Sequence, residues 1–265
     1  MLEFLLSSDA IFALITLTFL EVVLGIDNIV FISIVANKLP ENQRSKATNI
    51  GLVLAMVQRI VLLFFISFLI SLKTTIIDVN LSWFTTHVSW QSLILFSGGL
   101  FLLYKSTSEI YAKTEQPGKG EIQISKKNLS TLGNAIFQIV IIDFIFSVDS
   151  ILTAIGMTNG ISPNPNHALM IMVIAVVISM IIMIIFANPI RKFIDSHPSM
   201  QLLGLAFLIL IGFMLIAEAA HISETVIFKN SIGVIPKGYL YFAISFSLFV
   251  EFLNFKMNKK SKTTN

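Results

Sequence analysis

Long apolar stretches alternate with short polar ones along the whole chain, and this pattern predicts membrane-spanning helices. About 20 apolar residues in a helix are enough to cross the hydrocarbon core of a bilayer. Seven stretches approach that length, near residues 10–36, 48–72, 88–105, 132–157, 167–188, 201–219 and 238–256. Prolines such as Pro40, Pro189 and Pro198 fall outside or at the edges of these stretches, where they would end helices. We therefore expect an all-α polytopic membrane protein with seven transmembrane helices.

The composition agrees with this fold class. Of the 265 residues, 55% are hydrophobic and 12% charged, whereas a soluble domain carries about 25% charged residues. Fourteen lysines and arginines fall in one set of loops and in the C-terminal tail, against three in the other set. Short loops rich in Lys and Arg stay in the cytoplasm, so this distribution predicts an outside N-terminus and a cytoplasmic C-terminus. We expect a multi-pass protein of the bacterial cytoplasmic membrane.

The domain organisation predicted from the loops is one transmembrane domain, residues 1–265, with an internal repeat. A polar, basic linker near residues 106–131 separates a first group of three stretches (about 10–105) from a second group of three (about 132–219), and a seventh helix follows near 238–256. Because three is odd, the second group would cross the membrane in the opposite sense to the first. This is the inverted three-plus-three repeat of many secondary transporters, whose sites lie near the membrane midplane.

Two acidic segments interrupt the apolar pattern. Residues 21–28 read EVVLGIDN and residues 143–150 read DFIFSVDS, so Glu21 and Asp27, like Asp143 and Asp149, stand six residues apart. A carboxylate at the bilayer centre costs about 2.5–3.5 kcal/mol even on insertion scales, and it commonly marks a substrate, ion or proton path. Two matched pairs on segments of opposite sense favour one shared site.

The six-residue spacing leads to a hypothesis about the helices themselves. Positions six apart on a regular helix point about 120° away from each other. Both acids of a pair reach one cavity only if the cavity is wide or the helix is interrupted between them. Gly25 and Ser147 hold equivalent places and both weaken a helix. Our hypothesis is an unwound turn at each of the two positions.

The side chains available near these segments favour a hard metal ion. The candidate metal ligands, all with oxygen atoms, are Asp27, Asp149, Glu21, Asp143, Asn28 and Ser150, with Ser33 nearby. Such oxygens suit Mg²⁺, Ca²⁺ and Mn²⁺ and suit Cu⁺ or Zn²⁺ poorly. Two alternatives stay open: the acids hold the bundle together by hydrogen bonds, or they form a proton relay that binds no metal.

Three further polar residues lie within the apolar stretches. Arg59 follows Gln58 midway along the second stretch, and because an unpaired arginine there is costly, it should pair with one of the acids. That pair is a candidate gate, and a static salt bridge is the equal alternative. Glu251 in the seventh stretch is either a packing partner or part of the path.

The acidic segments closely resemble those of the TerC family of integral membrane proteins. Further matching segments are residues 35–40 (VANKLP), 98–103 (GGLFLL), 207–212 (FLILIG, after His197 and Pro198) and 246–254 (FSLFVEFLN), so the resemblance covers nearly the whole chain. The family is named for tellurium resistance, and its better-supported role is export of Mn²⁺. The resemblance implies that Asp27 and Asp149 are the central metal ligands, with Glu21 and Asp143 in support.

The expected function is Mn²⁺ efflux by a secondary transporter, with the bilayer, the divalent metal ion and protons as partners. Mn²⁺ would be the substrate, and no cofactor is expected. No phosphate-binding loop of an ATPase and no His-Glu-x-x-His signature occurs, so we expect no enzyme, and no nucleic-acid partner. A homo-oligomer is left open. The alternative is a membrane scaffold, assembly or tellurium-resistance factor without transport activity.

Overall fold

The computed structural model describes residues 4, 7–115, 131–158, 161 and 165–263. Within these ranges only the backbone is described for residues 24, 26, 27, 30, 66, 67, 149, 165, 255 and 258–263. Each of the seven predicted stretches is helical, and the bounds are α2 Ser8–Ala36, α3 Glu41–Phe64 with the short α4 Ile66–Ser71, α5 Trp90–Thr114, α7 Leu132–Thr158, α8 Pro165–Ser196, α9 Pro198–Ile222 and α10 Lys237–Thr263. The mostly helical architecture is confirmed.

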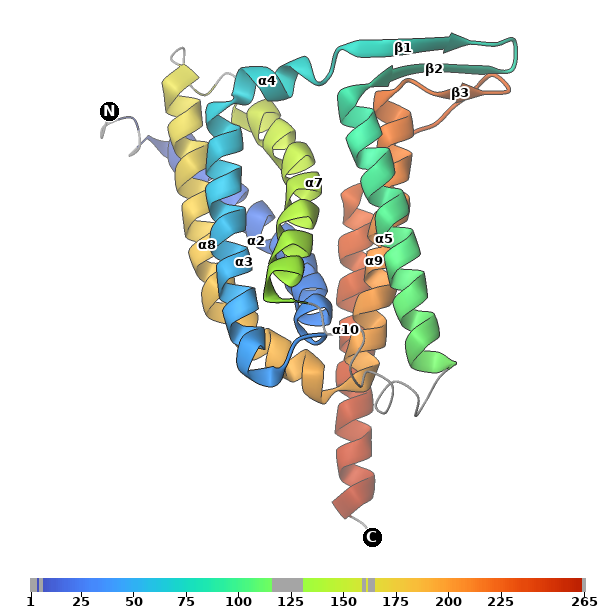
Figure 1. Cartoon of the computed structure of the whole chain (residues 1–265). Coiled ribbons are helices and arrows are strands. Elements are labelled where there is room, and N and C mark those ends of the chain that lie inside the picture. Colours follow the sequence, from blue (N-terminus) through green and yellow to red (C-terminus); the bar gives the residue numbers. More distant parts are fainter. Residues whose placement is uncertain (1–3, 5–6, 116–130, 159–160, 162–164, 264–265) are drawn as a thin grey trace.

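Four of these helices are long and apolar enough to cross a membrane, judged over the described residues. They are α3, α7, α8 and α9. The number of crossings and the outside N-terminus stay predictions. Successive long helices run in alternating directions, and α2 and α7 run in opposite senses, as Figure 1 shows.

The helices form two groups. In the first, α2 packs on α8 and α3 packs on α7, while α3 also contacts α8 and α2 also contacts α7. In the second, α5 packs along α9, and α10 lies against α9 (Figure 1). Exchanging α2 with α7, α3 with α8 and α5 with α9 maps these contacts, apart from the one made by α10, onto themselves. The pairing is the one that an inverted repeat requires, although the repeat boundaries stay predictions.

The α5/α9 pair depends on two glycines. A Cβ atom at Gly99 would lie 2.7 Å from the carbonyl oxygen of Gly212, and a Cβ at Gly212 would lie 2.9 Å from the carbonyl oxygen of Gly99. Both distances are shorter than real Cβ contacts, so only glycine permits this approach of the two backbones. Close packing through small residues is a common way for helices to associate in membranes.

A small antiparallel sheet was not predicted. Its strands β1 Thr75–Asn80, β2 Phe84–Ser89, β3 Val226–Ile227 and β4 Asn230–Ser231 follow one another in the order β1-β2-β3-β4. In the register, Phe84 pairs with Ile227 and Thr85 with Val226. The sheet covers one end of the α5/α9 pair (Figure 1), because β2 leads into α5 and β3 follows α9.

Helix α8 corrects one prediction made from the sequence. Pro189 was expected to end a helix, but α8 continues through it to Ser196. A proline inside a helix removes one backbone hydrogen bond and clashes with the preceding turn, which bends the helix. In Figure 1 the last turns of α8, drawn in orange, lie across the end of the bundle below α2 and α3.

Candidate functional site

A buried ion cluster joins α2, α3 and α7 at the acidic segments. The Arg59 guanidinium donates from Nε to Asp143 Oδ2 at 3.0 Å and from Nη2 to Asp143 Oδ1 at 2.7 Å. Its Nη1 donates to Glu21 Oε2. Arg59 is 2% exposed, Asp143 5% and Glu21 6%. One cation thus holds two acids, one from each acidic segment, and a planar bidentate contact fixes its orientation on Asp143.

Asp143 receives two more hydrogen bonds from its surroundings. Asn28 Nδ2 donates to Oδ1 at 3.3 Å, and Ser147 Oγ donates to Oδ2 at 3.1 Å. The Asn28 amide oxygen is buried and has no partner among the described residues. Ser150, the counterpart of Asn28, instead donates to the Ser147 carbonyl at 3.4 Å. The structure therefore brings Glu21, Asn28 and Asp143 together, while Ser150 bonds its own helix.

The hypothesis of unwound turns at Gly25 and Ser147 is wrong. Both α2 and α7 are continuous α-helices through these positions. Gly25 has a packing role, because a Cβ there would collide with the sulfur of Met183 on α8. Ser147 uses its hydroxyl on Asp143, four residues earlier on the same face. Each residue is explained without a break in the helix.

Continuous helices divide the four acids into two sets. On an unbroken helix, position 27 lies about 120° around from position 21, and position 149 lies likewise from 143. The side chains of Asp27 and Asp149 lie outside what the structure describes. Among the described side chains, no group of three His, Asp or Glu residues stands close enough to hold a metal ion. The role of Asp27 and Asp149 as ligands stays a prediction.

A small cavity of about 10 Å³ borders the ion cluster. Asn28 and Asp143 line it together with apolar residues that include Phe31, Ile32 and Leu52. Space of that size holds about one water molecule. Any ion at this place would have lost most of its hydration shell, and the ligand oxygens would replace it.

The other two candidates from the sequence make no described hydrogen bond to Asp143. Gln58 is half-buried beside Arg59, and its Nε2 atom has no partner among the described residues. Glu251 lies on α10 and accepts from Asn254 Nδ2 at 3.3 Å. The described contacts do not connect Glu251 with the ion cluster.

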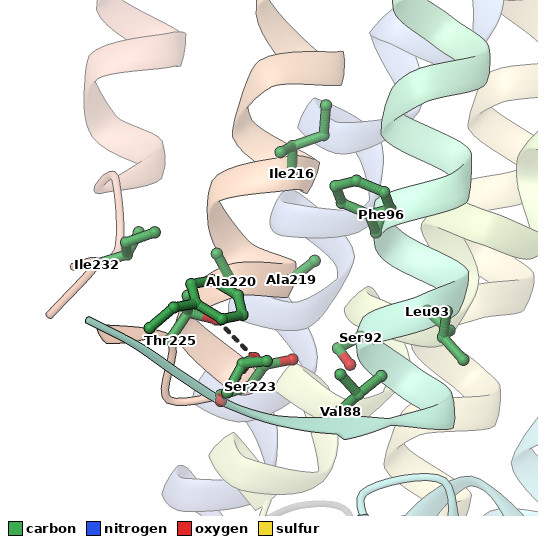
Figure 2. Close-up of a pocket in the computed structure, with 12 residues that line it drawn as sticks. Val88, Ser92, Leu93, Phe96, Ile216, Ala219, Ala220, Ser223, Thr225 and Ile232 are labelled. Atoms are coloured by element: carbon green, nitrogen blue, oxygen red, sulfur yellow. Dashed lines mark hydrogen bonds between the residues drawn. The ribbon is translucent and has the colours of Figure 1, made fainter. Parts of the chain in front are cut away.

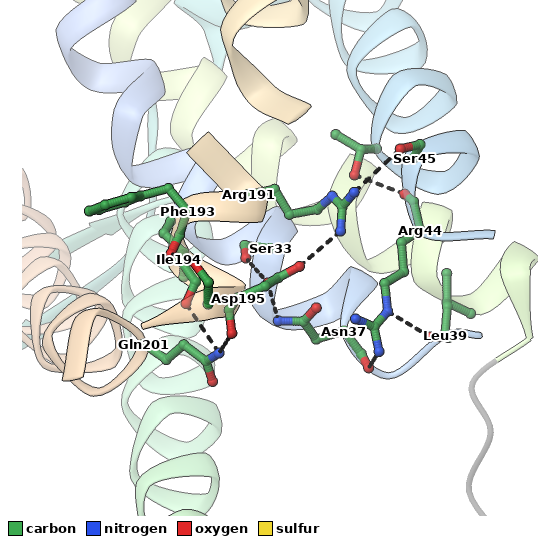
Figure 3. A network of polar contacts seen from close by, with 12 residues as sticks. Ser33, Asn37, Leu39, Arg44, Ser45, Arg191, Phe193, Ile194, Asp195 and Gln201 are labelled. Atoms are coloured by element: carbon green, nitrogen blue, oxygen red, sulfur yellow. Dashed lines mark hydrogen bonds and ion pairs between the residues drawn. The ribbon is translucent and has the colours of Figure 1, made fainter. Parts of the chain in front are cut away.

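A second polar cluster, which sequence reasoning missed, lies at the last turns of α8. Asp195 Oδ1 accepts from Ser33 Oγ at 3.1 Å and from Asn37 Nδ2 at 2.5 Å, both on or next to the end of α2. Asp195 Oδ2 accepts from Arg191 Nη1 at 2.9 Å, and Arg191 Nη2 donates to Ser45 Oγ on α3 at 3.3 Å. We call these five residues the α8-end cluster (Figure 3).

The signal for the α8-end cluster was present in the sequence. Arg191 and Asp195 stand four apart, which is the spacing of an ion pair on one helix face. It was overlooked because Pro189 was taken as the end of the helix. Ser33, expected near the metal ligands, belongs to this cluster instead.

An apolar pocket lies between α5, α9 and β2, away from the acids. It measures about 460 Å³ and is lined mainly by apolar side chains, among them Phe96, Ile216 and Ala219 (Figure 2). Two of its hydroxyl groups, those of Thr86 and Thr225, are hydrogen bonded to each other at 2.9 Å. The lining contains no acidic side chain, so it suits a cation poorly.

Comparison with known proteins agrees with the resemblance seen in the motifs. The chain is 40% identical over 262 residues to a UPF0053 protein of Haemophilus influenzae, covering 99% of this chain and all of that one. It is 42% identical over 253 residues to the UPF0053 inner membrane protein YgdQ of Escherichia coli K12, covering 96% of this chain and 95% of YgdQ.

Some relatives are longer. A UPF0053 protein of Buchnera aphidicola from Schizaphis graminum is 42% identical over 253 residues, and the match spans 44% of its length. No solved structure matches the chain. The relatives and the apolar helices indicate a multi-pass cell membrane protein. The family model described as "Integral membrane protein TerC family" matches residues 6–265, and the chain therefore belongs to the TerC family.

Proposed function

We propose that the protein exports a divalent metal ion, Mn²⁺, from the cytoplasm as a secondary transporter, and that it is not an enzyme. The observation that carries this proposal is the charge balance of α2 and α7. Their apolar middle parts contain four acids, at positions 21, 27, 143 and 149, and neither helix contains a lysine or arginine. Arg59 compensates for one charge of the Glu21–Asp143 pair.

The remaining negative charge needs a mobile partner. An uncompensated carboxylate is costly at membrane depth, so protons or a bound cation must neutralise the excess. Carboxylate and amide oxygens suit Mn²⁺ and other hard divalent ions. In this proposal Asp27 and Asp149 supply the carboxylates and the buried amide oxygen of Asn28 is a further ligand. Mn²⁺ rather than Mg²⁺ or Ca²⁺ rests on the family resemblance.

The transport cycle follows from exchange of the neutralising cations. Mn²⁺ from the cytoplasm would displace protons from the acids, and protons from outside would displace Mn²⁺ after the site has opened to the other side. An inward movement of protons would then supply the driving force. Glu21 and Asp143 act as counter-ions of Arg59 and keep the guanidinium fixed while the cargo changes.

The test is intracellular Mn²⁺ in a manganese-sensitive host that expresses the wild type, Asp27→Asn or Asp149→Asn. We expect the wild type to lower cell-associated Mn²⁺ and each variant to lose most of that effect, because each loses a charged ligand. Glu115→Gln is the control, since Glu115 is an exposed acid next to the end of α5. Unchanged Mn²⁺ with the wild type, or efflux by both variants that equals the efflux by the wild type, would overturn the proposal.

A second candidate is a membrane scaffold without transport activity. The observation in its favour is that the Asp143 carboxylate accepts four hydrogen bonds, as expected of a residue that stabilises the fold. The same experiment separates the two functions. A scaffold would leave Mn²⁺ unchanged, and Asp27→Asn would behave like the wild type.

A further inference from the structure

Helices from both halves of the chain meet in the α8-end cluster. Ser33 and Asn37 belong to the end of α2 and Ser45 to the start of α3, whereas Arg191 and Asp195 belong to α8. The bend that follows Pro189 lays this part of α8 across the ends of α2 and α3 (Figure 1). By the distribution of basic residues, this end of the bundle faces the cytoplasm.

The cluster lies directly on the way from the acidic segment of α2 to that side. Asn28 and Ser33 are five residues apart on one continuous helix, so the ion cluster and the α8-end cluster are about 8 Å apart along the α2 axis at 1.5 Å per residue. Phe31 and Ile32 fill the level between them and are at most 3% exposed. The cavity at Asn28 measures about 10 Å³, which leaves no room for a hydrated ion.

At the opposite, N-terminal end of α2, the packing leaves an open space. A pocket of about 200 Å³ lies there between α2 and α7, lined by residues that include Asp9, Thr16, Leu17 and Met157. Leu17 precedes Glu21 by about one helical turn. In the part of the chain that the structure describes, the site is thus closed by side chains at the α8 end and approached by a pocket at the other end.

The hydrogen bonding of the cluster suits a contact that opens. Arg191 is buried, yet its Nε atom and the Asn37 amide oxygen have no partner among the described residues. In a contact that never opens, both atoms should have hydrogen-bond partners, because a buried unpaired polar group is costly. Opening the cluster to water would give both atoms partners and so return part of the energy lost with the broken contacts.

We propose that the α8-end cluster is the cytoplasmic gate of the acidic site, with Asp195 as the residue that holds it closed through Ser33 and Asn37. This inference deepens the proposed function and rests on it. Asp195 touches no cargo and is a positioning residue. Separation of the end of α2 from α8 would open the level of Phe31 and Ile32 to the cytoplasm and admit the metal ion.

The test measures how readily a reagent in solution reaches position 32, and it requires no transport assay. The natural chain has no cysteine, so an Ile32→Cys substitution gives a single reporter between the two clusters. Inside-out membrane vesicles are treated with a charged, membrane-impermeant maleimide, and the labelling rate is compared with and without Asp195→Asn. A second reporter, Ser199→Cys, is exposed at the start of α9 and serves to normalise the rates.

We expect Asp195→Asn to raise labelling of the Ile32→Cys reporter roughly tenfold, because hydrogen bonds to a charged acceptor are the stronger ones. Ser33→Ala, which keeps the Arg191–Asp195 pair, should raise the labelling rate roughly threefold. If Asp195→Asn fails to reach the membrane, Ser33→Ala alone tests the gate. Glu41→Gln, an exposed acid at the same end, is the matched control and should leave the rate unchanged.

Two results would overturn the gate. One is an unchanged labelling rate in both cluster variants, and the other is labelling of the Ser199→Cys reporter from the outer side alone. Failure of the proposed function looks different. Export of Mn²⁺ with unchanged labelling refutes the gate alone, whereas raised labelling in a protein that exports no Mn²⁺ refutes the transport proposal and leaves the gate.

Discussion

Glu21 and Asp143 hold equivalent positions in the two acidic segments, yet their carboxylates accept different sets of hydrogen bonds. Asp143 accepts two hydrogen bonds from Arg59, one from Asn28 and one from Ser147. For Glu21 the described contact is Arg59 Nη1. One part of the difference arises from their neighbours four residues later, because Ser147 donates a hydrogen bond to Asp143 and Gly25 has no donor side chain. Asp143 anchors the guanidinium, and Glu21 is the more easily released partner.

The largest effect should follow loss of the cation that both acids share. Arg59→Gln leaves two buried carboxylates without a counter-charge and should destabilise the fold by about 3–5 kcal/mol. Thermal unfolding of the purified protein in detergent measures this. Arg59→Lys keeps the charge without the bidentate contact and should be milder. A stability of Arg59→Gln equal to that of the wild type would show that the acids are protonated.

Removing the Asp143 charge should have the next largest effect. Asp143→Asn weakens four hydrogen bonds, disrupts the bidentate contact and should cost about 3 kcal/mol. Glu21→Gln changes a single described contact, so it should cost roughly 1–2 kcal/mol in the same unfolding assay. Equal losses, or a larger loss for Glu21→Gln, would contradict the assignment of Asp143 as the anchor.

The smallest expected loss of stability tests the role of Ser147, the neighbour that donates to Asp143. Ser147→Ala removes one donor to Asp143 and should cost about 1 kcal/mol. Ser150→Ala is the matched control, because its hydroxyl bonds a backbone carbonyl at the long distance of 3.4 Å. The comparison is again made by thermal unfolding, and a control that loses more stability than Ser147→Ala would argue against the neighbour effect.

The sequence predicted the helices and the acids well, because both leave local signals. Apolar length placed a helix at each of the seven stretches, and the cost of a buried charge singled out Arg59 and the acids. The family resemblance was confirmed over nearly the whole chain. These features depend on residues close together in the sequence or on a strong energetic penalty.

Features set by contacts between distant segments were not predicted. Gly25 suggested a weak turn, but its neighbour Met183 on another helix explains it. Pro189 suggested a helix end, yet α8 passes through it and brings Asp195 to α2. The second half of the sheet was missed because β3 and β4 are two residues long and β3 pairs with β2, more than 130 residues earlier.

The sheet fixes where a path through the protein can open. Beyond the strand pairing, the His87 amide donates to the Ser223 carbonyl at 2.8 Å and the Phe228 amide to the Trp83 carbonyl at 2.9 Å. These bonds join the start of α5 to the end of α9, and the two glycine backbones clamp the same pair further along. The α5/α9 pair is therefore a fixed support. In an exporter of this architecture, the exit on the sheet side would be located beside the first turns of α2. The group formed by α2, α3, α7 and α8 would supply all the moving parts.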